Sequence, residues 1–301
     1  MNNRKNHVMF FIWVIALFAV LVYGYNEVFL TPSNFPTGKS FVINENESLK
    51  SISKRLEEGG YITSPLLFRA GISFLGKDRS IQLGGYVFET PVSLLGVVET
   101  FVRGGPSAPL LSVTIPEGST LLEVVALVTK ALPKLSQDVF IRTVTQYGAD
   151  GRLFPSTYFL LPSYTEESII KLMYSTFIKK AEPLITSSKI TAPLTSANDV
   201  IVLASLVEGE AKTEEDMKIV AGILLARLTK GMPLQVDVAL ETYKKKGLPT
   251  LPINNPGLVA ITSVLNPITS PYLYYLTGDD GKMYYSKTFE EHKKNIKKYL
   301  K

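Results

Sequence analysis

The chain has 301 residues, of which 46% are hydrophobic and 20% are charged, and its formal net charge is +5. These values are typical of a globular protein with two or three domains, and they exclude a disordered polymer. The sequence contains no cysteine, which excludes disulfides, thiol catalysis and thiolate metal sites, and with two histidines a His-based zinc site would need carboxylate ligands. The sequence implies neither a metal nor an organic cofactor.

The N-terminus carries an unbroken apolar run, residues 8–23, which follows two basic residues. A helix that continues to Tyr25 is about 27 Å long at roughly 1.5 Å per residue, close to the thickness of a bilayer core. The preceding positive charge predicts a cytoplasmic N-terminus and an exported remainder. We therefore assign residues 1–25 to a cytoplasmic tip and transmembrane anchor, and residues 26–40 to a linker. A signal peptide cleaved near Gly24 is the alternative.

Two stretches of the exported part resemble each other, residues 41–62 and residues 112–132. Each reads as a short strand, a turn that contains a glutamate, a helix cap and an apolar pattern with helical spacing. Ser48 caps the first expected helix, and Ser119 or Thr120 caps the second. The pattern indicates a pair of small βα modules, although strand–turn–helix is common enough for the likeness to arise by chance.

Between these modules, residues 83–88 read as a strand, and Gly104–Gly105–Pro106 then interrupts the chain. We place a domain boundary at this break. It separates a first module, residues 41–106, from a second domain, residues 107–301.

The second domain is mostly helical at its start. Helices are expected at 166–180 after a Thr165 cap, from Val200 to about Glu210 after an Asn198 or Asp199 cap, and from Thr213 to Gly231.

A Pro/Gly-rich stretch follows, residues 247–271. The chain then predicts a hairpin, with strands at 272–276 and 282–286, and an amphipathic helix with a solvated basic face over 292–301. The fold class we expect is α+β.

One carboxylate stands out on the helix that begins at Val200. Glu208 lies at the edge of the apolar face, beside the small side chain of Ala204. Partial burial there raises the pKa of a carboxyl toward the range of a general acid. Acids near helix ends are more commonly solvated surface groups, which is how we interpret Glu210.

The sequence motifs around this helix are similar to those of the endolytic murein transglycosylase, or YceG-like, family. The resemblance covers nearly all of the chain from about Phe41 onward, and it implies an N-terminal transmembrane anchor, a LysM-like module at 41–106 and a catalytic domain at 107–301. In chain order the matching words are FVINENESLKSISKRL, LGGYVFE, TIPEGST, DGRLFPSTY, ASLVEGEA, ARLTKGMPLQVD, GLPTLPINNPG and PYLYYLTGDDGKMYYSKTFEEH.

The resemblance implies cleavage of the MurNAc-β-1,4-GlcNAc bond within peptidoglycan strands, with 1,6-anhydro-MurNAc ends that terminate nascent strands. Glu208 matches the catalytic glutamate, which first protonates the leaving oxygen and then accepts the proton of the attacking C6 hydroxyl. The reaction needs no second carboxylate, unlike most glycoside hydrolases.

The same resemblance implies substrate-binding residues. Gln235 and Asp237 match an LQ-x-D word and would bind the sugars or orient Glu208, and Asn255 matches an NPG word. Tyr243 ends a word in which Glu241 replaces the usual asparagine. Two further departures from the family pattern are Asp150 and Met283. Sugar stacking or ordinary strand packing explains the remaining tyrosines, namely Tyr272, Tyr274, Tyr275, Tyr284 and Tyr285.

Two other functions stay open at this point. A catalytically weak, membrane-anchored peptidoglycan-binding protein would need no groove that joins Glu208, Gln235 and Asp237. A hydrolase would need a second acid near Glu208, for which Asp237 and Glu241 are the candidates. The expected partners are glycan strands, the bacterial inner membrane and peptidoglycan synthases, with the catalytic domain in the periplasm. No basic stripe with interleaved aromatics predicts a nucleic-acid partner.

Overall fold

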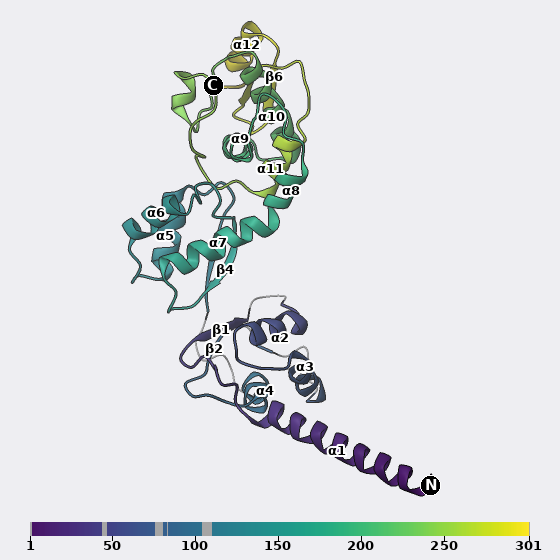
Figure 1. Ribbon diagram of the computed structural model, residues 1–301. Helices are drawn as coiled ribbons and strands as arrows, with labels where there is room; N and C mark the ends of the chain where they lie inside the picture. The colour runs from purple at the N-terminus through teal and green to yellow at the C-terminus, as the bar shows by residue number, and fades with distance from the viewer. Residues whose placement is uncertain (1, 44–46, 76–80, 83, 104–109, 301) are drawn as a thin grey trace. The chain divides into compact units, whose positions relative to one another are not determined.

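The structure is a computed structural model that divides into two compact units, Met1–Leu111 and Ser112–Lys301 (Figure 1). The predicted break at Gly104–Gly105–Pro106 lies outside the described residues, so the predicted domain limits stay a prediction. The residues that the structure describes are 2–43, 47–75, 81–82, 84–103 and 110–300.

Among its described residues, the first unit holds a two-stranded antiparallel sheet and four helices. Phe41 on one strand pairs with Tyr86 on the other. Tyr86 stacks on Phe101, with ring centroids 4.3 Å apart, and both rings are fully buried, so an aromatic cluster forms the core of this unit. The elements are α1 (Asn2–Phe29), β1 (Ser40–Ile43), α2 (Leu49–Glu58), α3 (Pro65–Phe74), β2 (Gly84–Val87) and α4 (Leu94–Arg103).

The N-terminal segment forms α1, which continues past Tyr25 to Phe29 and so includes part of the expected linker. α1 packs against α4 within this unit (Figure 1). Among the residues that the structure describes, no helix combines the length and the hydropathy that a membrane span requires.

The second unit is a mixed, mainly helical domain with two small sheets. β3 pairs with β4, and β5 pairs antiparallel with β6. Its elements are β3 (Leu111–Ile115), α5 (Leu121–Ala131), α6 (Gln137–Gln146), β4 (Ser156–Leu160), α7 (Glu166–Lys180), α8 (Glu182–Ser187), α9 (Ala197–Glu210), α10 (Glu214–Thr229), the 3₁₀ turn η1 (Leu240–Tyr243), α11 (Leu258–Leu265), β5 (Tyr274–Thr277), β6 (Met283–Ser286) and α12 (Phe289–Tyr299).

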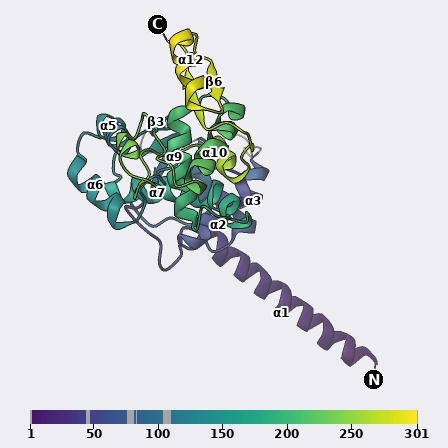
Figure 2. The same ribbon diagram turned by 90° about the horizontal axis from the view of Figure 1, so that it is seen from above.

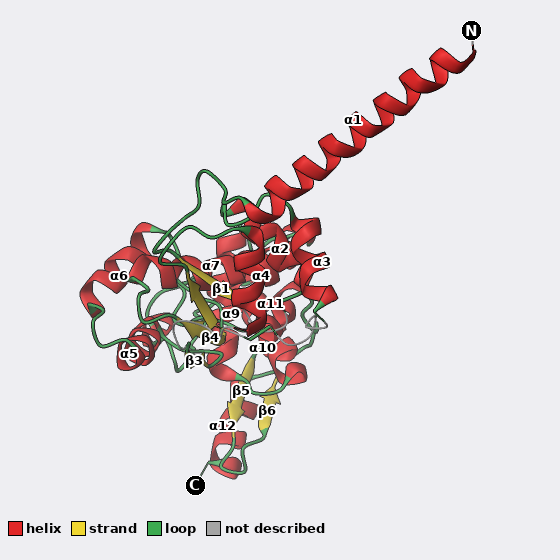
Figure 3. Cartoon of the chain, turned by 90° about the horizontal axis from the view of Figure 1, so that it is seen from below, coloured by secondary structure: helices red, strands yellow, loops and turns green. Residues whose placement is uncertain are grey.

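The centre of this unit is α9, which lies beside α10 in Figure 2 and packs against both α10 and α11 (Figure 1). Every residue from Val200 to Val207 is buried, so α9 is enclosed on all sides, whereas we expected an amphipathic helix with one apolar face. The β5–β6 hairpin and α12 extend away from these helices (Figure 3). The site residues therefore come from the ends of a rigid central helix and from the loops around it.

Several sequence predictions are confirmed in the mixed α+β fold. Ser48 caps α2, Thr165 caps α7 and Thr213 caps α10, each with a side-chain oxygen that accepts a backbone N–H. Thr120, not Ser119, caps α5, and it forms a capping box with the glutamate three residues later. The strand over 84–87 and the C-terminal hairpin are also observed.

The structure differs from the sequence analysis at three places. Ser196 caps α9 in place of Asn198 or Asp199, because Asp199 is the returning acid of a capping box and not the cap itself. The Pro/Gly-rich stretch contains a buried helix, α11, which starts directly after Gly257. The last helix begins at Phe289, because Thr288 caps it ahead of the expected start.

Candidate functional site

Glu208 lies in the last turn of α9, at the point where the buried helix reaches the surface. Its Oε2 accepts a hydrogen bond from the backbone N–H of Gly257 at 2.8 Å. Burial raises the pKa of the Glu208 carboxyl, the Gly257 bond opposes that rise, and the nearby charge of Glu117 adds to it. The direction of this pKa shift is the one that we expected from the helix pattern.

Two glycines allow other segments to approach this carboxyl closely. A Cβ at Gly257 would lie 2.1 Å from Oε1 of Glu117, and a Cβ at Gly118 would lie 3.2 Å from Cγ of Glu208. Glycine at these positions thus lets the turn after β3 and the start of α11 meet at the end of α9. We did not select Glu117 from the sequence, although it lies in the matching word TIPEGST.

Asn255 holds these segments together from inside. Its side chain is 2% exposed, its Nδ2 donates to the carbonyl of Ser119 at 2.9 Å, and its Oδ1 accepts from Leu153 N at 2.8 Å. The Asn255 backbone also bonds to Gly118 and Ser119. Both amide atoms are already paired within the fold, so we correct the expectation that this side chain binds sugar. Asn255 shapes the loops around Glu208.

The neighbouring Asn254 connects the same loop to α9. Its Nδ2 donates to the carbonyl of Ser205 at 2.9 Å, and the Ser205 hydroxyl accepts from Ile253 N at 3.1 Å. Ser205 therefore anchors the loop that carries Gly257.

Glu210 is half-buried, whereas we predicted a solvated surface group. Two residues apart on a helix, Glu208 and Glu210 point about 200° away from each other. Glu210 Oε1 accepts the backbone N–H of Asp237 at 3.0 Å. Burial raises the pKa of Glu210, and the charge of Asp237 acts in the same direction. The end of α9 thus carries two partly buried carboxyls on opposite sides of the helix, Glu208 beside Gly257 and Glu210 beside Asp237.

A cavity of about 480 Å³ opens on the Glu210 side and is lined by Gln235, Asp237 and Tyr243. This cavity does not join Glu208 with Gln235 and Asp237 in one groove, which is the feature that would distinguish an enzyme from a peptidoglycan-binding protein. The hydroxyl of Tyr243 donates to Oδ1 of Asp237. Gln235 is exposed and has a φ of 51°, a left-handed conformation that costs a residue with a Cβ. Glu208 is not among the lining residues, which are Glu210, Arg227, Gln235, Asp237, Tyr243, Tyr274, Tyr275, Leu276, Thr277, Phe289, His292, Ile296 and Leu300.

Two residues of this cavity went unassigned in the sequence. Arg227 is 4% exposed, and its guanidinium donates to the carbonyls of Leu273 and Leu234, so it ties the hairpin to the segment before Gln235. His292 stacks on Tyr274 with ring centroids 5.5 Å apart, and burial lowers its pKa. Arg227 and His292 both fall inside matching words, but no spacing rule marks either as a cavity residue.

The hairpin tyrosines divide into two groups. Tyr274 and Tyr275 line the cavity, where the Tyr274 ring already stacks on His292 and lies against the guanidinium of Arg227. Tyr272 stacks on Tyr285, and Tyr284 stacks on Tyr299.

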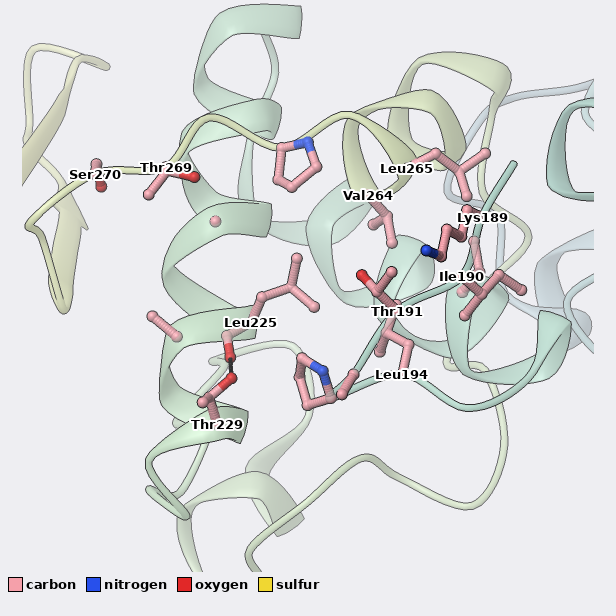
Figure 4. Close-up of a pocket in the computed structure, with 16 residues that line it drawn as sticks. Lys189, Ile190, Thr191, Leu194, Leu225, Thr229, Val264, Leu265, Thr269 and Ser270 are labelled. Carbon is pink, nitrogen blue, oxygen red and sulfur yellow. Dashed lines mark hydrogen bonds between the residues drawn. The ribbon is translucent and has the colours of Figure 1, made fainter. Parts of the chain in front are cut away.

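A second cavity, of about 280 Å³, lies where the loop before α9 meets α10 and the end of α11 (Figure 4). Leu225, Val264 and Leu265 contribute to its apolar lining, and none of the predicted site residues lines it. Within the part of the chain that the structure describes, no group of three His, Asp or Glu side chains could hold a metal ion.

Comparisons with known proteins cover most of the chain. The profile of the YceG-like family matches residues 41–241 and 239–298. The endolytic murein transglycosylase of Streptococcus pneumoniae serotype 2 (strain D39) is 27% identical, over 97% of this chain and 65% of its own length. This chain therefore spans slightly less than two thirds of that relative.

A second relative, the endolytic murein transglycosylase of Bacillus subtilis (strain 168), is 26% identical over 86% of this chain and 84% of its own length. The crystal structure of a YceG-like protein from Listeria monocytogenes superposes with a TM-score of 0.53 and 24% identity, over 85% of this chain and 98% of that one. The structural match supports the mixed α+β fold, and the family profile covers most of the sequence. The chain belongs to the YceG-like family.

Proposed function

We propose that this chain is an endolytic peptidoglycan lytic transglycosylase that cleaves the MurNAc-β-1,4-GlcNAc bond with Glu208 as its acid and base. The observation that carries the proposal is the state of Glu208, a partly buried carboxyl with a raised pKa that a backbone amide holds in one orientation. The relatives named endolytic murein transglycosylases support the same activity.

The proposed reaction needs one carboxyl in two protonation states. Protonated Glu208 donates to the glycosidic oxygen as the C1–O bond breaks, which leaves a carboxylate and a positively charged C1. The carboxylate then takes the proton from the C6 hydroxyl of the muramic sugar while that oxygen bonds to C1. The products are a 1,6-anhydro end and a free GlcNAc hydroxyl, and the carboxyl is protonated again.

The cavity on the Glu210 side suits the sugars next to the cleaved bond. An endolytic enzyme binds a polymer that extends past the reacting sugars, so a strand that crosses the end of α9 would contact both of its sides. Gln235 and Asp237 offer polar groups to sugar hydroxyls. Tyr243 orients the Asp237 carboxylate for this contact.

We also propose that residues 8–23 anchor the chain in the bacterial inner membrane, with the N-terminus in the cytoplasm and the second unit in the periplasm. The support is the unbroken apolar run and the two basic residues that precede it. An enzyme held at the membrane would meet strands as they are made, so peptidoglycan synthases are the partners that we propose.

The test is digestion of purified glycan strands by the full chain in detergent, followed by strand-length analysis. We expect the native protein to shorten the strands and Glu208→Gln to leave them intact, with Glu215→Gln, an exposed acid on α10, as the matched control. Binding without shortening by the native protein would favour a peptidoglycan-binding function. Equal shortening by Glu208→Gln would remove Glu208 from the reaction.

A further inference from the structure

The carboxyl of Glu117 lies against Gly257, the residue whose amide binds Glu208. A Cβ built at Gly257 would approach Oε1, Cδ and Cγ of Glu117 to 2.1, 2.3 and 2.8 Å. The same amide donates to Glu208 Oε2 at 2.8 Å. Two acidic side chains from distant parts of the sequence therefore approach one glycine.

The turn that carries Glu117 is fixed. Gly118 N donates to the carbonyl of Asn255 at 3.0 Å, and the Ser119 hydroxyl donates to the carbonyl of Pro116 at 2.7 Å. Gly118 has a φ of 73°, which a residue with a Cβ rarely adopts. The backbone on either side of Glu117 is thus held in place.

The Glu117 side chain is exposed to solvent, and no hydrogen bond or ion pair of its carboxylate is seen among the described residues. Glu123 in the next helix differs, because its carboxylate caps that helix through Thr120. Glu117 instead brings negative charge next to a second acid, which is unfavourable for folding. Such an arrangement is typical of sites where proton affinity is adjusted for chemistry.

We propose that Glu117 is a positioning residue for the reaction proposed above, and that its charge beside Glu208 keeps the Glu208 proton in place until a glycosidic oxygen receives it. The inference rests on the proposed function of Glu208. The charge of Glu117 acts in the direction that this role requires.

The other groups around Glu208 do not supply this charge. α9 contributes Glu210, which points to the opposite side and interacts with Asp237. α11 contributes the neutral amide of Gly257. Within the described residues, Glu117 is the charged group that acts on Glu208.

The experiment is a carbon-13 NMR titration of the Glu208 carboxyl in the full chain, with its signal assigned by its loss in Glu208→Gln. Removal of the negative charge in Glu117→Gln should lower the pKa of Glu208. Glu117→Asp keeps the charge and should retain most of the raised pKa of Glu208. Glu215→Gln should leave the pKa of Glu208 unchanged. In pH–rate profiles, Glu117→Gln should move the alkaline limb to lower pH and reduce the rate there by about fivefold.

A second variant keeps the test decisive if Glu117→Gln folds poorly. Gly257 has a φ of −78°, which alanine adopts freely, so Gly257→Ala should keep the backbone and push the Glu117 carboxyl away. We expect the same direction of change as in Glu117→Gln. An unchanged Glu208 titration in both variants would overturn the inference. Absence of cleavage by the native protein would overturn the proposed function instead, because the titration reports on Glu117 without any turnover.

Discussion

The hydrogen bond from Gly257 N to Glu208 Oε2, 2.8 Å long, joins the last turn of α9 to the first residue before α11. An N–H donor pairs with the unprotonated oxygen of a carboxyl, so the proton of Glu208 belongs on Oε1. This bond therefore fixes both the orientation of the acid and the oxygen that donates to the substrate.

Glu208 should reduce stability at neutral pH. Its folded pKa is raised, so the folded state favours the protonated form, and the stability from that form is lost as pH rises through the folded pKa. Glu208→Gln should therefore be more stable than the native protein at neutral pH, by about 1 kcal/mol. Thermal unfolding from pH 4 to pH 8 measures the difference, which should narrow toward acid pH. A difference that grows as pH falls would contradict the burial of this carboxyl.

Asn255 should matter for stability more than for affinity. Asn255→Ala leaves Leu153 N without a partner in a buried position and removes a bond to Ser119, which should cost about 2 to 4 kcal/mol in denaturant unfolding. Asn254→Ala is the matched control and should cost less. The Asn254 side chain makes one hydrogen bond, from Nδ2 to the carbonyl of Ser205, and its Oδ1 is already unpaired among the described residues, so fewer bonds are lost. Equal costs would argue against the network that we assign to Asn255.

Substitutions of Gln235 should distinguish the cost of its backbone strain from its contribution to sugar binding. Its φ of 51° costs a residue with a Cβ about 1 to 2 kcal/mol, part of which glycine relieves. Gln235→Gly should therefore be more stable than Gln235→Ala by about 0.5 to 1 kcal/mol. Both variants lose the amide, so both should raise the KM for glycan strands equally, by about threefold to tenfold. Native KM values in both would remove Gln235 from the binding surface.

Tyr243 should act through Asp237. The hydrogen bond to Asp237 raises the pKa of Tyr243 to about 12, so the phenol stays a donor at every assay pH. Tyr243→Phe releases the Asp237 side chain and should weaken glycan binding by about threefold to tenfold. Calorimetry in a Glu208→Gln background measures binding without cleavage.

The control for that experiment is Tyr284→Phe. Tyr284 also donates to an aspartate, Asp280, but it lies on the hairpin and outside the cavity. Its loss should leave glycan affinity unchanged. Equal weakening by the two variants would point to a general effect on folding.

The sequence predicted those helix starts that depend on a capping side chain and a backbone N–H within a few residues of each other. The caps Ser48, Thr165 and Thr213 each bond to a backbone N–H three residues later, so short sequence windows contain the whole interaction. α11 was missed because its residues are apolar on most sides and follow a proline and a glycine. Its burial against α9 and α10 stabilises a helix that local propensity does not indicate.

The site was predictable only in part for a similar reason. The partial burial of Glu208 could be inferred from its apolar neighbours in the sequence, and the resemblance selected Gln235, Asp237 and Tyr243, which line one cavity. The inward role of Asn255 could not be inferred, because its partners Ser119 and Leu153 are more than 100 residues away. The burial of Glu210 likewise depends on a long-range contact with Asp237.

The measurement that tests the account most directly is mass spectrometry of the new strand ends after digestion in oxygen-18 water. The account predicts 1,6-anhydro-MurNAc ends, lighter than reducing ends by one water and free of label, from the native protein and none from Glu208→Gln. Reducing ends that carry oxygen-18 would contradict it, because water and not the C6 hydroxyl would then have attacked C1.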